Sequence, residues 1–355
     1  MRIILITLLI NLTFTLNPES LMRYLKSLIG SALLALSFEA ASDVNVYSYR
    51  QSFLIEPIFA AFTEETGIKV NTVFAKKGLV ERLQNEGGNS PADLLLTTDS
   101  GPLYRAVDLG LTQAVDSDIL SNNIPSEFRD PTGHWFGLSS RARLIVASKD
   151  RVDAATLKDY EDLANPEFQS RVCTRSGKHN YMVALNASII AHHGLEPAAT
   201  WLSGVKDNLA RKPQGNDRAQ VKAILQGECD VAIINSYYMG AMLADDEQKA
   251  WAESVNIIFP NQSNRGTHMN ISGASLTAAA PNREDAIRLI EFMSENLAQG
   301  IYAESNYEYP VNPDVPRSEL VQSWGDFKRD TLPLADIAKH RAEAVKLADK
   351  VAYDQ

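Results

Sequence analysis

Two adjacent tyrosines, Tyr237 and Tyr238, stand in the segment IINSYYMGAML, where an apolar run gives way to small polar residues. Asn235 and Ser236 before them are typical of the end of a strand. A third phenol, Tyr181, follows polar residues and a glycine in CTRSGKHNYMV. A phenol titrates near ~10 in water and is neutral at working pH. A highly charged cation reverses this, because it stabilises the phenolate and drives the proton off.

Phenolate oxygen is a hard, strongly donating ligand. Hard cations prefer oxygen, whereas zinc and copper sites are usually built from histidine and cysteine. Three converging tyrosinates would therefore suit iron(III) better than calcium or zinc. The alternative is ordinary aromatic packing between two lobes, and the pattern alone does not separate the two. Arg50, Arg141 and Arg175 lie near predicted strand ends and could hold an anion beside a metal, or form surface ion pairs.

Other kinds of site find little support in the sequence. The six histidines show no metal-ligand spacing, and there is no G-x-S-x-G, P-loop or G-x-G-x-x-G motif. Without an assembled nucleophile and base, we do not expect an enzyme. The formal net charge of -10 argues against a nucleic-acid partner, whose binding surface would be basic.

Strands and helices alternate in a way that positions these residues. Apolar or alternating segments predict strands at residues 43–50, 68–74, 92–98, 142–148 and 230–236. Helical spacing predicts helices at residues 56–67, 78–87, 181–194, 281–299 and through the tail from 318 to 350. This order predicts an α/β fold with parallel strand pairs. In such sheets ligands bind beyond the carboxyl ends of the strands, where the tyrosines are predicted to lie.

The N-terminal region has the pattern of an export signal. Met22 is followed by basic residues, an apolar run over 28–36 and small residues at 40–42, which is typical of a secretory signal peptide. We therefore expect translation to start at Met22 and the region 1–42 to be removed. The alternative, a membrane anchor over 3–16, is short of the ~20 residues needed to span a bilayer. The remaining length favours two lobes.

Cys173 and Cys229 are the only cysteines. Because an exported protein folds in an oxidising compartment, we expect them to form one disulfide, and two buried free thiols are the alternative.

Several segments together resemble the iron(III)-binding periplasmic proteins of bacterial ABC iron importers. They are VYSYRQ, PADLLLTTDSGPLYRAVDLGL, GLSSRARLIVAS, GNDRAQVKAILQGECDVAIINSYYMG and NYEYPVNP, and the resemblance runs from about Asp43 to the C-terminal helices. It implies a clamshell fold of two lobes, each a mixed sheet flanked by helices, with two crossing strands as the hinge. The expected N-lobe is 43–139 plus 264–314, and the expected C-lobe is 140–263 plus 315–355.

The same resemblance implies roles for individual residues. Tyr237 and Tyr238 match the family's adjacent phenolate ligands, and Tyr181 matches the third. Arg141 matches an arginine that lines the cleft in some members. Many members have His-Tyr where this chain has Gln51 and Ser52. It therefore resembles the subgroup that completes the metal's coordination with a bound anion such as carbonate, which Gln51 and Arg50 would steady.

The expected function is capture of iron(III) in the periplasm and delivery to an inner-membrane ABC permease and its ATPase, by a monomer. The preference between iron(III) and iron(II) stays open. The second hypothesis is a protein of the same fold that carries a polyamine, a phosphonate or another oxyanion, with Asp99 and Tyr104 as the hints of a polyamine site. A secreted hydrolase is the third.

Overall fold

The computed structural model describes residues 43–355, which cluster as one unit. The expected signal region 1–42, with the alternative anchor over 3–16, lies outside the described residues. Within residues 43–355, no helix combines the length and the apolar character that crossing a bilayer requires.

Three parallel strands form the first part of the sheet. They are β1 (Val44–Ser48), β2 (Val70–Phe74) and β3 (Leu94–Thr97), and β1 pairs with both of the others. The helices α3 (Ser52–Thr66) and α4 (Leu79–Glu86) connect them, so the predicted alternation is confirmed. The predicted helix at 56–67 is wrong at its start, because α3 begins at Ser52 and carries Pro57 in its interior.

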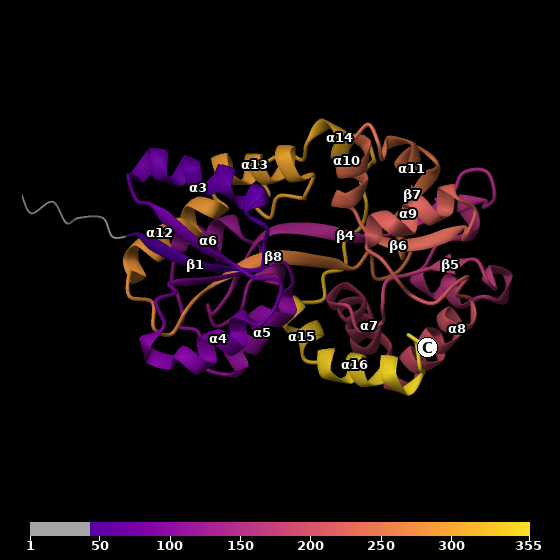
Figure 1. The fold of residues 1–355 in the computed structure, drawn as a ribbon, viewed down its shortest axis with the longest axis horizontal. Helices are drawn as coiled ribbons and strands as arrows, with labels where there is room; N and C mark the ends of the chain where they lie inside the picture. The colour runs from indigo at the N-terminus through magenta and orange to yellow at the C-terminus, as the bar shows by residue number, and fades with distance from the viewer. Residues whose placement is uncertain (1–42) are drawn as a thin grey trace, which may run out of the picture. The chain divides into compact units, whose positions relative to one another are not determined.

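Two long strands connect this part of the sheet to the rest. The first half of β4 (Phe136–Ser148) pairs antiparallel with β8 (Met269–Leu276), and its second half pairs with β6 (Val231–Asn235) and β7 (Val255–Ile258). The two-residue β5 (Val172–Cys173) lies parallel to β6. The strand order is β2-β1-β3-β8-β4-β6-β5, with β7 on β4. Figure 1 shows β4 and β8 running between two groups of elements, as expected of crossing strands.

The remaining helices of the body cover both faces of this mixed sheet (Figure 1), which confirms the α/β prediction. They are α5 (Ser100–Asp108), α6 (Asp118–Asn123), α7 (Asn180–His193), α8 (Leu195–Asp207), α9 (Asp217–Leu225), α10 (Tyr237–Leu243), α11 (Lys249–Glu253), α12 (Arg283–Ser294) and α13 (Asn296–Asn306). Every residue of β3, β4 and β8 is buried, so the core follows the crossing strands. The residue boundaries of the two lobes stay a prediction.

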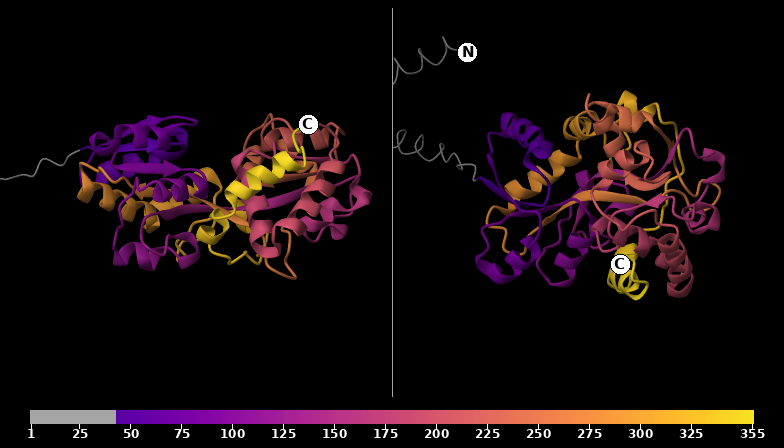
Figure 2. Two further views of the ribbon diagram at one scale, coloured as in Figure 1. Left: turned by 90° about the horizontal axis from the view of Figure 1, so that it is seen from below. Right: turned by 45° about the vertical axis from the view of Figure 1, so that its right-hand side comes forward.

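The predicted helical tail from 318 to 350 is wrong in its middle. Three helices occur there: α14 (Glu319–Gln322), α15 (Leu334–Ala338) and α16 (Arg341–Lys350). Gly325, at φ 88°, and Pro333 interrupt the pattern, since the first takes a left-handed conformation and the second cannot continue a helix. The helix α16, yellow in Figure 2, packs on α7, and α15 contacts both α5 and α7.

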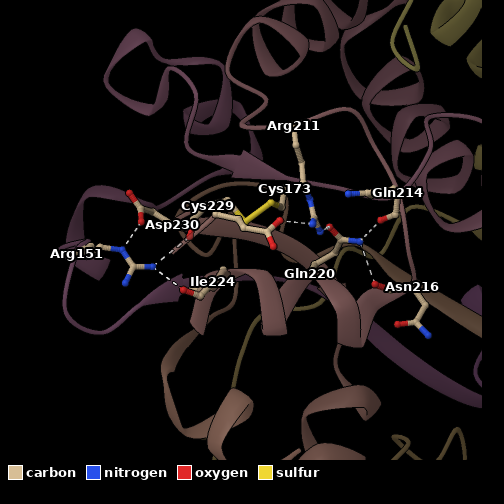
Figure 3. Close-up of a disulfide and its surroundings, with 10 residues drawn as sticks. Arg151, Cys173, Arg211, Gln214, Asn216, Gln220, Ile224, Cys229 and Asp230 are labelled. Carbon is tan, nitrogen blue, oxygen red and sulfur yellow. Dashed lines mark hydrogen bonds and ion pairs between the residues drawn. A yellow bond between two sulfur atoms is a disulfide. The ribbon is translucent and has the colours of Figure 1, made fainter. Parts of the chain in front are cut away.

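The disulfide prediction is confirmed. Cys173 in β5 is bonded to Cys229, which precedes β6, with 5.9 Å between their Cα atoms (Figure 3). Beside it, Asp230 accepts from the guanidinium of Arg151 at 2.5 Å and that of Arg171 at 2.7 Å. The disulfide thus ties β5 to the segment that enters β6, and the carboxyl ends of these two strands lead to the tyrosines.

Candidate metal centre

The tyrosine pair opens a helix directly after a buried strand. The strand β6 ends at Asn235, and Tyr237 and Tyr238 are the first two residues of α10. Ser236 fixes the turn, because its amide donates to the carbonyl of Ala142 at 2.9 Å and its hydroxyl accepts from the amide of Ala142 at 3.2 Å. The two phenol rings lie 4.3 Å apart between centroids. The helical turn thus brings neighbouring side chains to one side, which an extended strand would not do.

Tyr181 reaches the same place from another helix. It is the second residue of α7, and its hydroxyl oxygen lies 3.2 Å from that of Tyr237. His179, the N-cap of α7, accepts from the amide of Tyr181 at 3.2 Å, and the two rings meet edge to face at 4.6 Å. The three phenols therefore stand at the N-terminal ends of two helices, where the helix dipole favours a negative charge.

A cavity of about 390 Å³ brings together most of the predicted site residues. Its wall includes Tyr181, Tyr237, Tyr238, Arg50, Gln51 and Arg141. Arg175 is not part of that wall. Its guanidinium carbon lies 5.1 Å from the centre of the Tyr181 ring, and one of its nitrogens donates to Asp217 at 3.1 Å.

Charged side chains in the wall of this cavity form a buried network. Arg50 pairs with Glu308 at 2.5 Å, and Arg141 lies 3.8 Å from the same carboxylate. Both guanidinium groups also donate to the hydroxyl of Ser272, at 2.7 and 2.9 Å. Two cations thus share one carboxylate, and the excess positive charge favours an anion in the cavity.

A second buried network, centred on Asp217, lies beside the ring of Tyr181. The side chain of Asp217 is fully buried and accepts from Arg143 at 2.8 Å, from Arg175 at 3.1 Å and from the amide of Asn235 at 2.8 Å. Neither Asp217 nor Glu308 is among the site residues that the sequence predicts. Each lies inside a segment that carries the resemblance, GNDRAQ and NYEYPVNP, and an acidic residue among such polar motifs was the available signal.

The cavity disfavours charged phenols while it holds no cation. Burial raises the pKa of Tyr237 well above its ordinary value, and the neighbouring Tyr181 and Tyr238 raise it further. Burial and then Tyr181 also raise the pKa of Tyr238. Burial, assisted by Arg175, lowers the pKa of His179 to about 4. At neutral pH Tyr237, Tyr238 and His179 are therefore uncharged, and a cation bound by the pair would have to displace their protons.

Among residues 43–355, no group of three or more His, Cys, Asp or Glu side chains is arranged to hold a metal ion. The tyrosine cavity offers a different donor set, three phenol oxygens beside an excess of positive charge.

Residues 89–326 match the family described as bacterial extracellular solute-binding protein. Iron uptake protein A1 of Synechocystis is 44% identical over 314 residues, which cover 88% of this chain and 87% of that protein. The crystal structure of Mannheimia haemolytica ferric iron-binding protein A in an open conformation has a TM-score of 0.83 and 52% identity, over 89% of this chain and 100% of that one.

A Trichodesmium protein in complex with iron and citrate ligands has a TM-score of 0.84 and 41% identity, over 88% of this chain and 99% of that one. The likeness to these solved structures confirms the expected two-lobed α/β fold.

Proposed function

Because this chain belongs to the bacterial extracellular solute-binding protein family, alongside iron uptake and ferric iron-binding proteins, we propose that it captures iron(III) through Tyr181, Tyr237 and Tyr238. It then acts as a binding protein in transport rather than as an enzyme. In this proposal the periplasm is its compartment, and an ABC permease with its ATPase receives the metal.

One observation carries the assignment of the ligands. The hydroxyl oxygens of Tyr181 and Tyr237 lie 3.2 Å apart, with the Tyr238 ring beside them, in one cavity. Neutral phenols gain little from such crowding, whereas a trivalent cation would bind all three as phenolates. The cost of burying those negative charges is then offset by the metal itself.

A small anion such as carbonate completes the coordination in this proposal. Gln51 and Ser52 offer iron(III) only neutral donors, and the excess positive charge of Arg50 and Arg141 over Glu308 lies on the same cavity. These groups would hold the anion against the metal. Protonation of the phenolates, reduction of the metal or loss of the anion would each ease its release.

Visible absorption tests the ligand set directly. Iron(III) added with bicarbonate to the metal-free protein should give a tyrosinate-to-iron charge-transfer band. Tyr238→Phe and Tyr237→Phe should each weaken iron binding by about a hundredfold or more, since each removes a charged ligand. Tyr104→Phe, which changes a half-buried tyrosine outside the tyrosine cavity, is the matched control.

A colourless iron-loaded protein, or a Tyr238→Phe variant that binds iron as tightly as the Tyr104→Phe control, would contradict the assignment.

An oxyanion carrier is the second candidate, favoured by the same excess of positive charge on the cavity. Such a protein would bind sulfate or a phosphonate without metal, and its affinity would not depend on the tyrosine hydroxyls. Thermal shift with each anion, against iron(III) plus bicarbonate, separates the two. A polyamine is disfavoured because Arg50, Arg141 and Arg218 line the cavity, and because Asp99 is already paired with Arg341 at 2.9 Å.

A further inference from the structure

A second cavity, of about 600 Å³, lies next to the tyrosine cavity and has no part in the proposed capture of iron. We call it the lysine groove, after Lys76, Lys77 and Lys178 in its wall. The loop before α4, the helices α4 and α5, the start of α7 and the segment α15–α16 enclose it. Tyr49 and Thr98 line both cavities, so the two have a common wall.

The lysine groove concentrates positive charge in a negatively charged protein. Six basic and two acidic side chains line it, whereas the chain as a whole has a formal net charge of -10. Three of these basic groups are neutralised by ion pairs: Lys178 with Asp349 at 2.5 Å, Lys339 with Asp336 at 2.6 Å and Arg105 with Glu81 at 2.9 Å. Lys76 and Lys77 have none among the residues that the structure describes. A concave surface with unneutralised cations raises the local concentration of anions.

Two further groups in the wall have hydrogen bonds left to donate. Nη2 of Arg341 pairs with Asp99, but its Nη1 is buried with no hydrogen-bond partner in the described part of the chain. The hydroxyl of Tyr49 accepts from the amides of Leu79 at 2.9 Å and Val80 at 3.1 Å. A phenol with both acceptor positions used still has its own proton to donate.

We propose that the lysine groove binds a small polycarboxylate anion. The unpaired cations are two ammonium groups, which act as point charges and suit separate carboxylates along an extended molecule. A compact phosphate would be better matched by a free guanidinium fork, and the fork of Arg341 is already half occupied by Asp99. Bound there, the anion lies one shared wall away from the tyrosines and needs no metal.

Calorimetry on the metal-free protein tests this proposal, with tricarballylate as the probe. This tricarboxylate lacks the hydroxyl group that makes a related anion a strong iron chelator. The double variant Lys76→Ala/Lys77→Ala should raise the Kd for tricarballylate by about tenfold at fixed ionic strength. Lys69→Ala/Lys212→Ala removes the same charge from exposed positions outside the groove, and should change the Kd by less than about twofold.

The tyrosine variants separate this proposal from the capture of iron. Tyr237→Phe/Tyr238→Phe should keep its affinity for tricarballylate while losing iron. If both lysine double variants lose affinity for tricarballylate equally, the attraction is non-specific and the proposal is overturned. Loss of tricarballylate binding in the tyrosine variant would also overturn it, because that result would place the anion in the tyrosine cavity. Tighter binding of pyrophosphate than of tricarballylate would overturn the assignment to carboxylates.

Discussion

At the scale of single residues, the proposed capture of iron by the three tyrosines couples metal binding to proton release. Burial raises the pKa of Tyr237 and Tyr238, so both phenols enter the binding reaction protonated at neutral pH. Each phenolate formed must release one proton. The affinity for iron(III) should therefore rise with pH, by up to about tenfold per pH unit for each proton released.

Proton release can be counted directly. When iron(III) is supplied as the same chelate with the same anion, wild-type protein loaded to saturation should release about one proton more than Tyr181→Phe loaded to saturation. A pH-stat measures the difference, with Tyr104→Phe as the control that should match wild type. Equal proton counts for wild type and Tyr181→Phe would show that this phenol does not ionise on binding.

His268 makes a separate prediction about stability in acid. The ring is buried, and neither of its nitrogens has a hydrogen-bond partner among the described residues. Burial, with Arg143 as the next cause, lowers its pKa to about 3. The folded protein therefore keeps this ring neutral, whereas the unfolded chain protonates it below pH ~6.5. The stability that depends on the neutral ring is present above that pH and is lost as the pH falls towards 3.

Wild-type protein should accordingly lose about 2 kcal/mol more unfolding free energy between pH 6.5 and 5.0 than His268→Gln does. Urea unfolding at the two pH values measures this difference. A variant with the same pH dependence as wild type would exclude His268 as the source.

At the scale of elements, the C-terminal segment is tied to the first turn of α5. Arg341, at the start of α16, pairs at 2.9 Å with Asp99, the N-cap of α5, and both side chains are largely buried. Gly101 lies directly under this guanidinium, and a Cβ there would overlap it. The absence of a side chain at Gly101 therefore makes room for the ion pair.

Arg341→Ala and Gly101→Ala should each lower the free energy of unfolding by about 2 kcal/mol. The first variant removes the ion-pair partner of buried Asp99, and the second displaces the Arg341 guanidinium from it. The double variant should lose little more than either single one, because both act on the same contact. Chemical unfolding measures all three. As a control, Lys339→Ala removes an exposed ion pair to Asp336 and should lower the free energy of unfolding by less than about 0.5 kcal/mol. Additive losses at Gly101 and Arg341 would contradict this coupling.

Local patterns in the sequence predict much of the element order, because strand alternation and the strand-to-helix turn at Tyr237 depend on residues that are neighbours in the sequence. What they could not predict depends on distant partners. Arg50 forms an ion pair with Glu308, which is 258 residues away in the sequence, and Asp217 forms ion pairs with Arg143 and Arg175. The predicted tail helix is wrong for a different, local reason. The apolar spacing of the tail continues past Gly325 and Pro333, but the backbone at these two residues cannot continue a helix.

At the scale of the whole molecule, the proposed capture of iron requires the two lobes to close. A ligand that binds the closed form more tightly shifts the population towards it. The radius of gyration of the metal-free protein should therefore fall when iron(III) and bicarbonate are added. Small-angle X-ray scattering measures this change, and Tyr238→Phe under the same conditions should show none. An unchanged radius in iron-loaded wild type would mean that binding does not close the molecule.

The strand β4 passes from one part of the sheet to the other within a single residue step. Ala142 is the last to pair with β8, and Arg143 is the first to pair with β6. Arg141 on one side of that step belongs to the Glu308 network, and Arg143 on the other side belongs to the Asp217 network. Gain or loss of one residue here would turn one of these arginines to the opposite face. In related proteins, insertions and deletions should therefore be absent between Arg141 and Arg143, even where the surface loops vary in length.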